Sequence, residues 1–188
     1  MLRSTYSIVA GLMLIASIGP GCAPPEADFN KLALAQNLAN AGQWDECIPV
    51  VKDFLTLAPY DSAGHALLGR AFLHGTDLQL MMAQGEFNAA LELLRVQRKT
   101  GKLQQRPLDE GLELSITEEM ALLHFTWVSL YIDQGGQDKE EIESHLESCH
   151  TFIEYSLRLD AESVRIKALN SRLVRLEKRL GIPERIRA

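Results

Sequence analysis

A short apolar pattern recurs in this chain at an interval of 34 residues, and it constrains the possible folds more than any other feature. Leu34-Ala35-x₂-Leu38 returns as Leu68-Gly69-x₂-Phe72, with all three positions shifted together. A third copy reads His124-x₂-Trp127-Val128-x₂-Tyr131. A repeat of this length is one supersecondary unit that cannot bury its apolar face alone, so we expect neighbouring copies to stack.

Turn signals follow the repeated pattern. Gly42 comes seven residues after Ala35, and Gly135 comes seven residues after Val128. In the second copy the matching turn is expected at Gly85-Glu86-Phe87, which predicts an insertion of nine residues.

The chain is expected to be all-α. Aromatic residues make up only 6% of it, Leu and Ala are abundant, and no segment alternates as a strand does. Cap residues, Gly and Pro set the expected helix ends, and a loop is expected over 101–114. The predicted helices run from Asp28 to Gly42, Trp44 to Leu57, Asp61 or Ser62 to about Ala83, Phe87 to about Lys99, Ser115 or Thr117 to Ile132, Asp138 to Leu159, and Ala161 to Leu180.

The repeat resembles the tetratricopeptide family, a helix–turn–helix unit with the pattern W-x₂-L-G-x₂-Y, then A-x₃-F, then P. The second copy matches best, through His65-x₂-Leu68-Gly69-x₂-Phe72 and Ala90-x₃-Leu94. The first copy has Cys47-x₃-Val51, and the third has Glu141-x₃-His145. The resemblance covers residues 28–160. It implies a short right-handed superhelix of antiparallel hairpins, closed by a basic amphipathic capping helix and tail in 161–188.

In this family the first helix of each hairpin lines the concave surface. The positions one turn apart on these helices are polar in all three copies, which is also expected of a solvated groove that binds nothing. The resemblance implies a partner-binding groove formed by Gln36, Asn40, Arg70, His74, Ser129 and Asp133. The family's Lys/Asn clamp for C-terminal carboxylates is not reproduced, so that ligand is not expected.

The first 22 residues are typical of an export signal. Arg3 precedes an apolar run from Ile8 to Ile18, which is too short for a comfortable membrane span. The segment resembles a bacterial lipoprotein signal over 1–21, with Cys22 as the residue that would receive the lipid and 22–27 as a tether. Ordinary cleavage near Ala23 and an uncleaved anchor are the alternatives. By resemblance, Ala23 after the cysteine implies an outer-membrane protein that faces the periplasm.

Charge excludes a basic nucleic-acid binder, because the formal net charge is −6. The basic residues gather in two places, over 95–106 and from Arg165 onward. In the second region the apolar positions Ile166, Leu169, Leu173, Leu176 and Leu180 form a narrow seam. This helix is expected to cap the repeats; the alternative is that it docks on a partner helix or on anionic lipid.

No catalytic motif is present, so we expect no enzymatic activity and no cofactor. Glu141, His145 and Cys149 share one helix strip that could hold a metal, but a solvated helix face explains them better, and no metal site is predicted. Cys47 and Cys149 are expected to be buried free thiols rather than a disulfide, since two hairpins separate them.

Two functions remain at this point. The first is a membrane-tethered scaffold that binds an unknown envelope protein or peptide and assists the assembly of a cell-envelope complex. The alternative is an exported accessory protein that holds a small molecule between its helices for a transporter. Neither follows from the fold alone.

Overall fold

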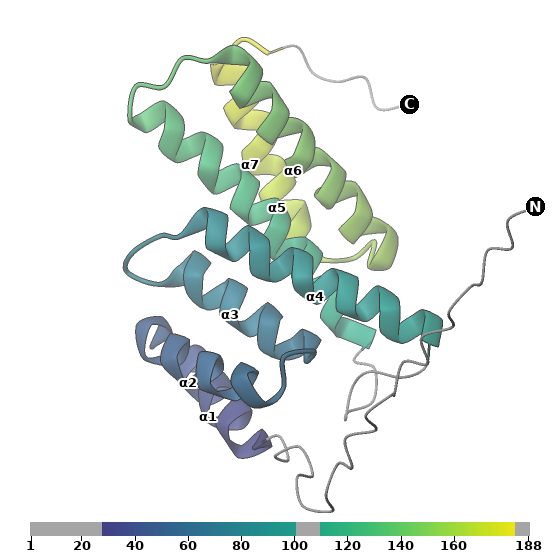
Figure 1. The fold of residues 1–188 in the computed structure, drawn as a ribbon. Coiled ribbons are helices and arrows are strands. Elements are labelled where there is room, and N and C mark those ends of the chain that lie inside the picture. Colours follow the sequence, from purple (N-terminus) through teal and green to yellow (C-terminus); the bar gives the residue numbers. More distant parts are fainter. Residues whose placement is uncertain (1–27, 101–109, 183–188) are drawn as a thin grey trace, which may run out of the picture.

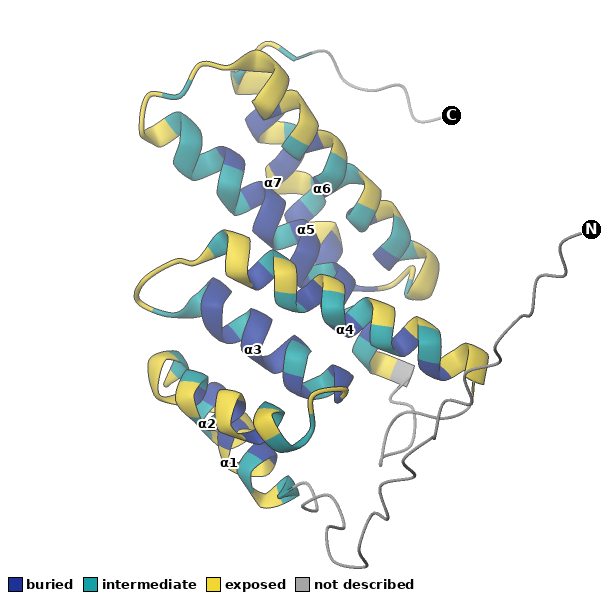
Figure 2. Cartoon of the chain, viewed as in Figure 1, coloured by how far each residue is buried: buried dark blue, intermediate teal, exposed yellow. Residues whose placement is uncertain are grey.

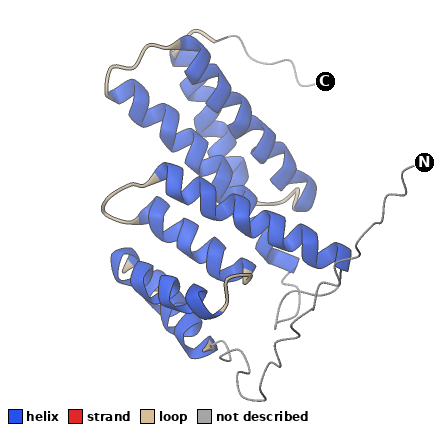
Figure 3. Cartoon of the chain, in the orientation of Figure 1, coloured by secondary structure: helices blue, strands red, loops and turns tan. Residues whose placement is uncertain are grey.

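The computed structural model describes residues 28–100 and 110–182. Within these ranges the chain is entirely helical, with no strand, which confirms the all-α prediction for this part of it (Figure 1, Figure 3). The segments 1–21 and 22–27, with Cys22, lie outside the described residues. The helices are α1 (Phe29–Asn40), α2 (Trp44–Leu57), α3 (Ser62–His74), α4 (Leu80–Thr100), α5 (Glu110–Asp133), α6 (Lys139–Leu159) and α7 (Val164–Arg179).

The helices stack as antiparallel hairpins in chain order (Figure 1). Each helix contacts the next one along the chain, and α1 also contacts α3, α3 contacts α5, and α5 contacts α7. Within the described helices, α2, α4 and α6 make no such contacts with one another. The odd-numbered helices therefore form one continuous layer, and the even-numbered helices lie outside it.

Helix α5 is shared by two apolar cores. Ile116, Met120 and Leu123 of α5 join the core formed with α1 to α4. Phe125 and Val128 join a second core with α6 and α7. Figure 2 shows these buried surfaces between the helices, with α3 buried along most of its length. The C-terminal seam belongs to the second core: Ile166, Leu169, Leu173 and Leu176 are buried and Leu180 is half-buried. The seam is thus covered within the chain.

Several predicted helix starts are confirmed by their caps. The side chain of Asp28 accepts a hydrogen bond from the Asn30 N–H, and that of Asp61 accepts one from the Gly64 N–H. Asp138 caps α6 in the same way. The last helix begins at Val164 rather than Ala161, because the Ser163 hydroxyl accepts from the Ile166 N–H and fixes the start there.

The third helix ends earlier than predicted. It stops at His74 instead of continuing to Ala83, and residues 75–79 form the turn. Asp45, at the start of α2, accepts hydrogen bonds from the Thr76 N–H (3.0 Å) and the Thr76 hydroxyl (2.5 Å). The residues after Thr76 include good helix formers, but they belong to α4 instead of extending α3. The hydrogen bonds from Thr76 to Asp45 of α2 fix the turn between the two helices.

The fifth helix starts earlier than predicted. It begins at Glu110, so 110–114 is helical rather than loop, and the rest of that expected loop lies outside the described residues. Glu113 stabilises this first turn by accepting hydrogen bonds from Arg98 of α4 and Tyr155 of α6. These partners are distant in sequence, so local propensity gives no sign of them.

Two thiols reveal how the hairpins correspond. The Cys47 Sγ donates to the Ala35 carbonyl (3.4 Å), and the Cys149 Sγ donates to the Ala121 carbonyl (3.2 Å). In the middle hairpin Ala83, also fully buried, lies against Gly69. Ala35, Gly69 and Ala121 are therefore equivalent. Both cysteines are buried and unpaired with each other, as predicted.

This correspondence corrects the expected register of the second copy. The small residue that faces Gly69 is Ala83, with Phe87 four residues later, rather than Ala90 with Leu94. Ala83 is the fourth residue of α4, just as Cys47 is the fourth residue of α2. The predicted turn at Gly85 is absent because Gly85 lies inside α4. Only two residues are inserted in the turn, which spans 75–79 instead of 41–43.

The third copy shifts as well. Asp133, the end of α5, lies twelve residues after Ala121, whereas α1 and α3 end five residues after Ala35 and Gly69. Helix α6 likewise starts ten residues before Cys149, whereas α2 starts three before Cys47. Helices α5 and α6 are therefore each longer by seven residues, about two turns, at the end of the hairpin where the turn joins them. The Trp127, Val128 and Tyr131 positions of the predicted third copy lie in this extension, and His124 lies just before it.

Candidate functional site

Two of the six predicted groove residues converge on a buried carboxylate. The Arg70 Nε lies 3.3 Å from Glu119 Oε1, and the His74 Nε2 donates to Glu119 Oε2 at 3.0 Å. From α7, Arg165 donates to Glu119 Oε1 at 2.8 Å. Glu119 thus connects α3, α5 and α7, three successive helices of the four in the odd-numbered layer.

The Glu119 side chain is only 2% exposed and remains ionised. Burial by itself would raise the pKa of this carboxyl, but the hydrogen bond from His74 and the charge of Arg165 outweigh it and lower the pKa to about 2. Arg70 and His74 are therefore first of all structural partners of Glu119, and only their outer atoms remain available to a ligand.

The other four predicted groove residues do not join this cluster. Gln36 and Asn40 are exposed on α1. Ser129 donates to the Phe125 carbonyl within its own helix, and Asp133 is exposed at the end of α5. In the observed register the positions equivalent to Arg70 and His74 are Leu122 and Thr126. Ser129 and Asp133 lie two turns beyond them, on the hairpin extension.

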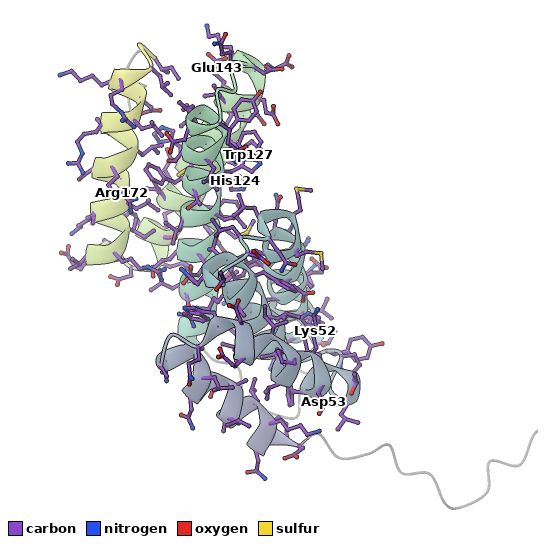
Figure 4. The ribbon with its side chains drawn as sticks, turned by 90° about the vertical axis from the view of Figure 1, so that its left-hand side faces the viewer. Lys52, Asp53, His124, Trp127, Glu143 and Arg172 are labelled. Atoms are coloured by element: carbon purple, nitrogen blue, oxygen red, sulfur yellow. The ribbon has the colours of Figure 1, made fainter. Side chains whose placement is uncertain are left out.

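The extension carries a stack of rings. Trp127 stacks on His145 with ring centroids 3.8 Å apart and on Tyr131 at 4.8 Å. The Nδ1 atoms of His124 and His145 lie 2.9 Å apart, so that one donates to the other. His124 in turn stacks on Phe152. Figure 4 shows His124 and Trp127 close together on α5.

Acid should destabilise this ring stack. Burial, with a contribution from the neighbouring His145, lowers the pKa of His124 to about 4. The pKa of His124 in the folded protein lies below its unfolded value of 6.5, so folding favours the neutral ring. The stability that results is fully present above pH 6.5 and is lost as the pH falls toward 4. We expect the free energy of unfolding to fall by about 2 kcal/mol between pH 7.5 and 5 on this account.

The measurement is urea unfolding of the wild type and of His124→Gln at both pH values. Gln keeps a polar side chain at this position but does not titrate, so the variant should show the smaller loss. Equal losses in the two proteins would contradict the assignment.

The residues of the helix strip Glu141, His145 and Cys149, for which no metal site was predicted, lie in different environments. His145 belongs to the ring stack, and Cys149 faces the core, where burial raises the pKa of its thiol to about 12. His150 donates to the nearly buried Glu177 of α7 at 2.7 Å. In the ranges 28–100 and 110–182, no group of three or more His, Cys, Asp or Glu side chains is placed to hold a metal ion.

A cavity of about 740 Å³ lies between α4, the start of α5 and the end of α6. Its basic residues are Arg95, Arg98 and Lys99, all on α4. Glu113 also lines it, with a side chain 10% exposed and paired with Arg98, and the Tyr155 hydroxyl donates to Glu113 at 2.5 Å. The remaining lining residues are Asn88, Leu91 and Glu92.

Sequence reasoning missed the two residues that organise these sites. Glu119 was recognisable only as an acidic residue suited to the first turn of a helix, and Glu113 fell in an expected loop. Each is buried with hydrogen-bond donors from other helices: Glu119 with Arg70, His74 and Arg165, and Glu113 with Arg98 and Tyr155. The only available sign was the local excess of basic residues over 95–106, which is consistent with partners elsewhere in the chain.

Comparison with protein-family models, with curated proteins and with solved structures finds no match to this chain. Among the described residues, no helix combines the length and the apolar character that crossing a membrane requires.

Proposed function

We propose that this protein is a membrane-tethered scaffold whose helical repeats hold another protein of the cell envelope. The observation that carries the proposal is the continuous layer formed by α1, α3, α5 and α7, in which each odd-numbered helix contacts the next. Helical repeats that stack in this way expose an extended surface along one side, and such surfaces commonly bind protein partners. The arrangement supports a tetratricopeptide-like superhelix with α7 as its cap.

The tether is proposed from the sequence. An export signal over 1–21 followed by Cys22 would place an acylated cysteine six residues before Asp28. Acyl chains contribute about 0.8 kcal/mol per buried CH₂, so a multiply acylated Cys22 would hold the domain at a membrane, on its periplasmic side, without a spanning helix. The proposed activity is binding, with no chemical step.

The tether is tested by the intact mass of the protein purified from membranes. We expect a mass that starts at Cys22 and includes acyl chains. Alkylation without reduction should label neither Cys47 nor Cys149 until the protein is denatured, because burial raises the pKa of both thiols, to about 11 and about 12. A mass that starts at Ala23 or beyond, or one that retains Met1, would refute the tether.

The scaffold is tested by site-specific photo-crosslinking in the membranes of the source cell. A crosslinking residue at Gln36 or Asn40 on the odd-numbered layer should capture one defined envelope protein. The same residue at Thr151, exposed on α6, is the control and should not capture it. Equal capture from all three positions would contradict binding by the odd-numbered layer.

A further inference from the structure

The cavity between α4, α5 and α6 is built from residues that the repeat does not require. Helix α4 has 21 residues against 14 in α2, and the extra seven, 94–100, carry Arg95, Arg98 and Lys99. Helix α5 also extends further on the N-terminal side of Ala121 than α3 does on the N-terminal side of the equivalent Gly69. The additional residues form a first turn that carries Glu113. Arg98 and Glu113 join these two extensions to each other, whereas Arg95 and Lys99 make no ion pair with another helix among the described residues.

The cavity has an excess of positive charge. Arg98 is paired with Glu113. The Arg95 Nη1 lies 3.4 Å from the Glu92 Oε2, and the side chains of Arg95 and Glu92 are each more than 60% exposed. An ion pair this exposed contributes little and exchanges easily. Lys99, and Arg158 beside the Tyr155 ring, make no ion pair with any described residue. Three cations thus line the cavity with two carboxylates, and a fourth, Arg158, lies beside the lining residue Tyr155, in a chain whose net charge is −6.

The buried Glu113 holds two donors in place. Hydrogen bonds from Arg98 and Tyr155 outweigh burial and lower the pKa of Glu113, so the carboxylate stays ionised and oriented. The Glu113 carboxylate occupies one side of the Arg98 guanidinium, which has five N–H donors. The N–H groups that do not bond to Glu113 remain for a ligand. Leu91 and the Tyr155 ring supply an apolar surface next to these donors.

We propose that this cavity binds a phosphate group carried on a partly apolar body. A phosphate presents oxygens in several directions, which suits the three cations Arg95, Arg98 and Lys99 on α4, whereas a carboxylate presents only two oxygens. The volume lies within the range of about 300–1,000 Å³ that is usual for small-ligand sites.

A phospholipid head group is one source of such a ligand. Because the hairpins are antiparallel, the first turn of α1 and the last turns of α4 lie at the same end of the stack (Figure 1). A lipid on Cys22 would therefore hold the cavity close to the membrane surface, and in this respect the inference rests on the proposed tether. A soluble phosphorylated compound is the other source, and it does not depend on the tether.

Isothermal titration calorimetry of the full chain in a non-ionic detergent tests the site. The probes are inorganic phosphate, dihexanoylphosphatidylglycerol and, as the zwitterionic comparison whose choline cancels the phosphate charge, dihexanoylphosphatidylcholine. We expect the phosphatidylglycerol to bind and the phosphatidylcholine to bind at least about tenfold more weakly, because net negative charge is what the basic wall recognises. Binding of inorganic phosphate alone would support the site and assign it to a soluble phosphorylated ligand.

Two variants assign the binding to this cavity. Lys99→Gln removes an exposed charge that has no described ion-pair partner, so the fold should persist while affinity falls about fivefold to tenfold. Tyr155→Phe removes the hydroxyl on Glu113 and should weaken binding less. Arg175→Gln removes the same charge from the exposed face of α7 and should leave affinity unchanged within about twofold.

Failure of all three probes to bind, or an equal loss in Lys99→Gln and Arg175→Gln, would overturn the phosphate site. Neither result would affect the mass test of the tether, and an unacylated protein would still bind phosphate in this assay.

Discussion

Replacing Glu119 with Gln should lower the free energy of unfolding by about 3 kcal/mol at pH 7. The carboxylate is buried and accepts hydrogen bonds from Arg70, His74 and Arg165. A Gln side chain has the same shape but no charge, and its NH₂ group would face other N–H groups instead of accepting hydrogen bonds from them. Removal of one member of a buried ionic cluster typically costs about 3–5 kcal/mol. Chemical unfolding in urea measures the effect, and in a domain of this size the midpoint of thermal unfolding should fall by about 6–12 °C.

The effect of Glu119→Gln should depend on pH in a defined direction. The folded pKa of Glu119, about 2, lies below the ordinary value of 4.5. The stability it supplies is therefore complete above pH 4.5 and is lost as the pH falls toward 2. Wild type and variant should converge in strong acid.

The control for this variant is Glu154→Gln, an exposed position on α6, which should change stability by less than about 0.5 kcal/mol. If Glu119→Gln is no more harmful than this control, Glu119 does not connect the three helices as described.

Replacing Phe87 with Ala should cost about 3–5 kcal/mol, because the ring is fully buried and its loss leaves a cavity against α3. The same ring explains why Gly69 is a glycine. A Cβ at Gly69 would lie 2.7 Å from the Phe87 Cε1 and 2.8 Å from its Cδ1, and 3.2 Å from the Ala83 carbonyl oxygen, which would have to move by a few tenths of an ångström. Gly69→Ala should thus destabilise the wild type by about 1–2 kcal/mol, although Ala is the better helix former by about 1 kcal/mol.

The sign of Gly69→Ala should reverse once the ring is removed. In a Phe87→Ala background the new methyl group fills part of the cavity, and we expect a gain of about 0.5–1 kcal/mol. Gly85→Ala is the matched control on α4, since nothing lies within 4 Å of its Cβ position, and it should stabilise the protein in either background. The same sign for Gly69→Ala in both backgrounds would show that Phe87 does not exclude a side chain there.

Two physical causes account for the predictions that were wrong. The predicted extent of α3 and the predicted loop before α5 were wrong because Asp45 holds the turn after α3 and because Arg98 and Tyr155 stabilise the first turn of α5. The register of the second and third copies was wrong because an α-helix can gain seven residues, about two turns, and present the same face again. Apolar spacing is then unchanged, and the sequence offers several equally good matches.

The sequence by itself determined the helical class, the order of the hairpins, most of the helix caps and the burial of both thiols. These depend on local hydrogen bonds and on apolar periodicity, which neighbouring residues encode. The tertiary structure alone decided which small residues face each other, that Arg70 and His74 bind Glu119, and that the basic end of α4 borders a cavity. Each of these depends on a charge or a ring contributed by another helix, and the strength of such a contact is set by burial, which exists only once the chain has folded.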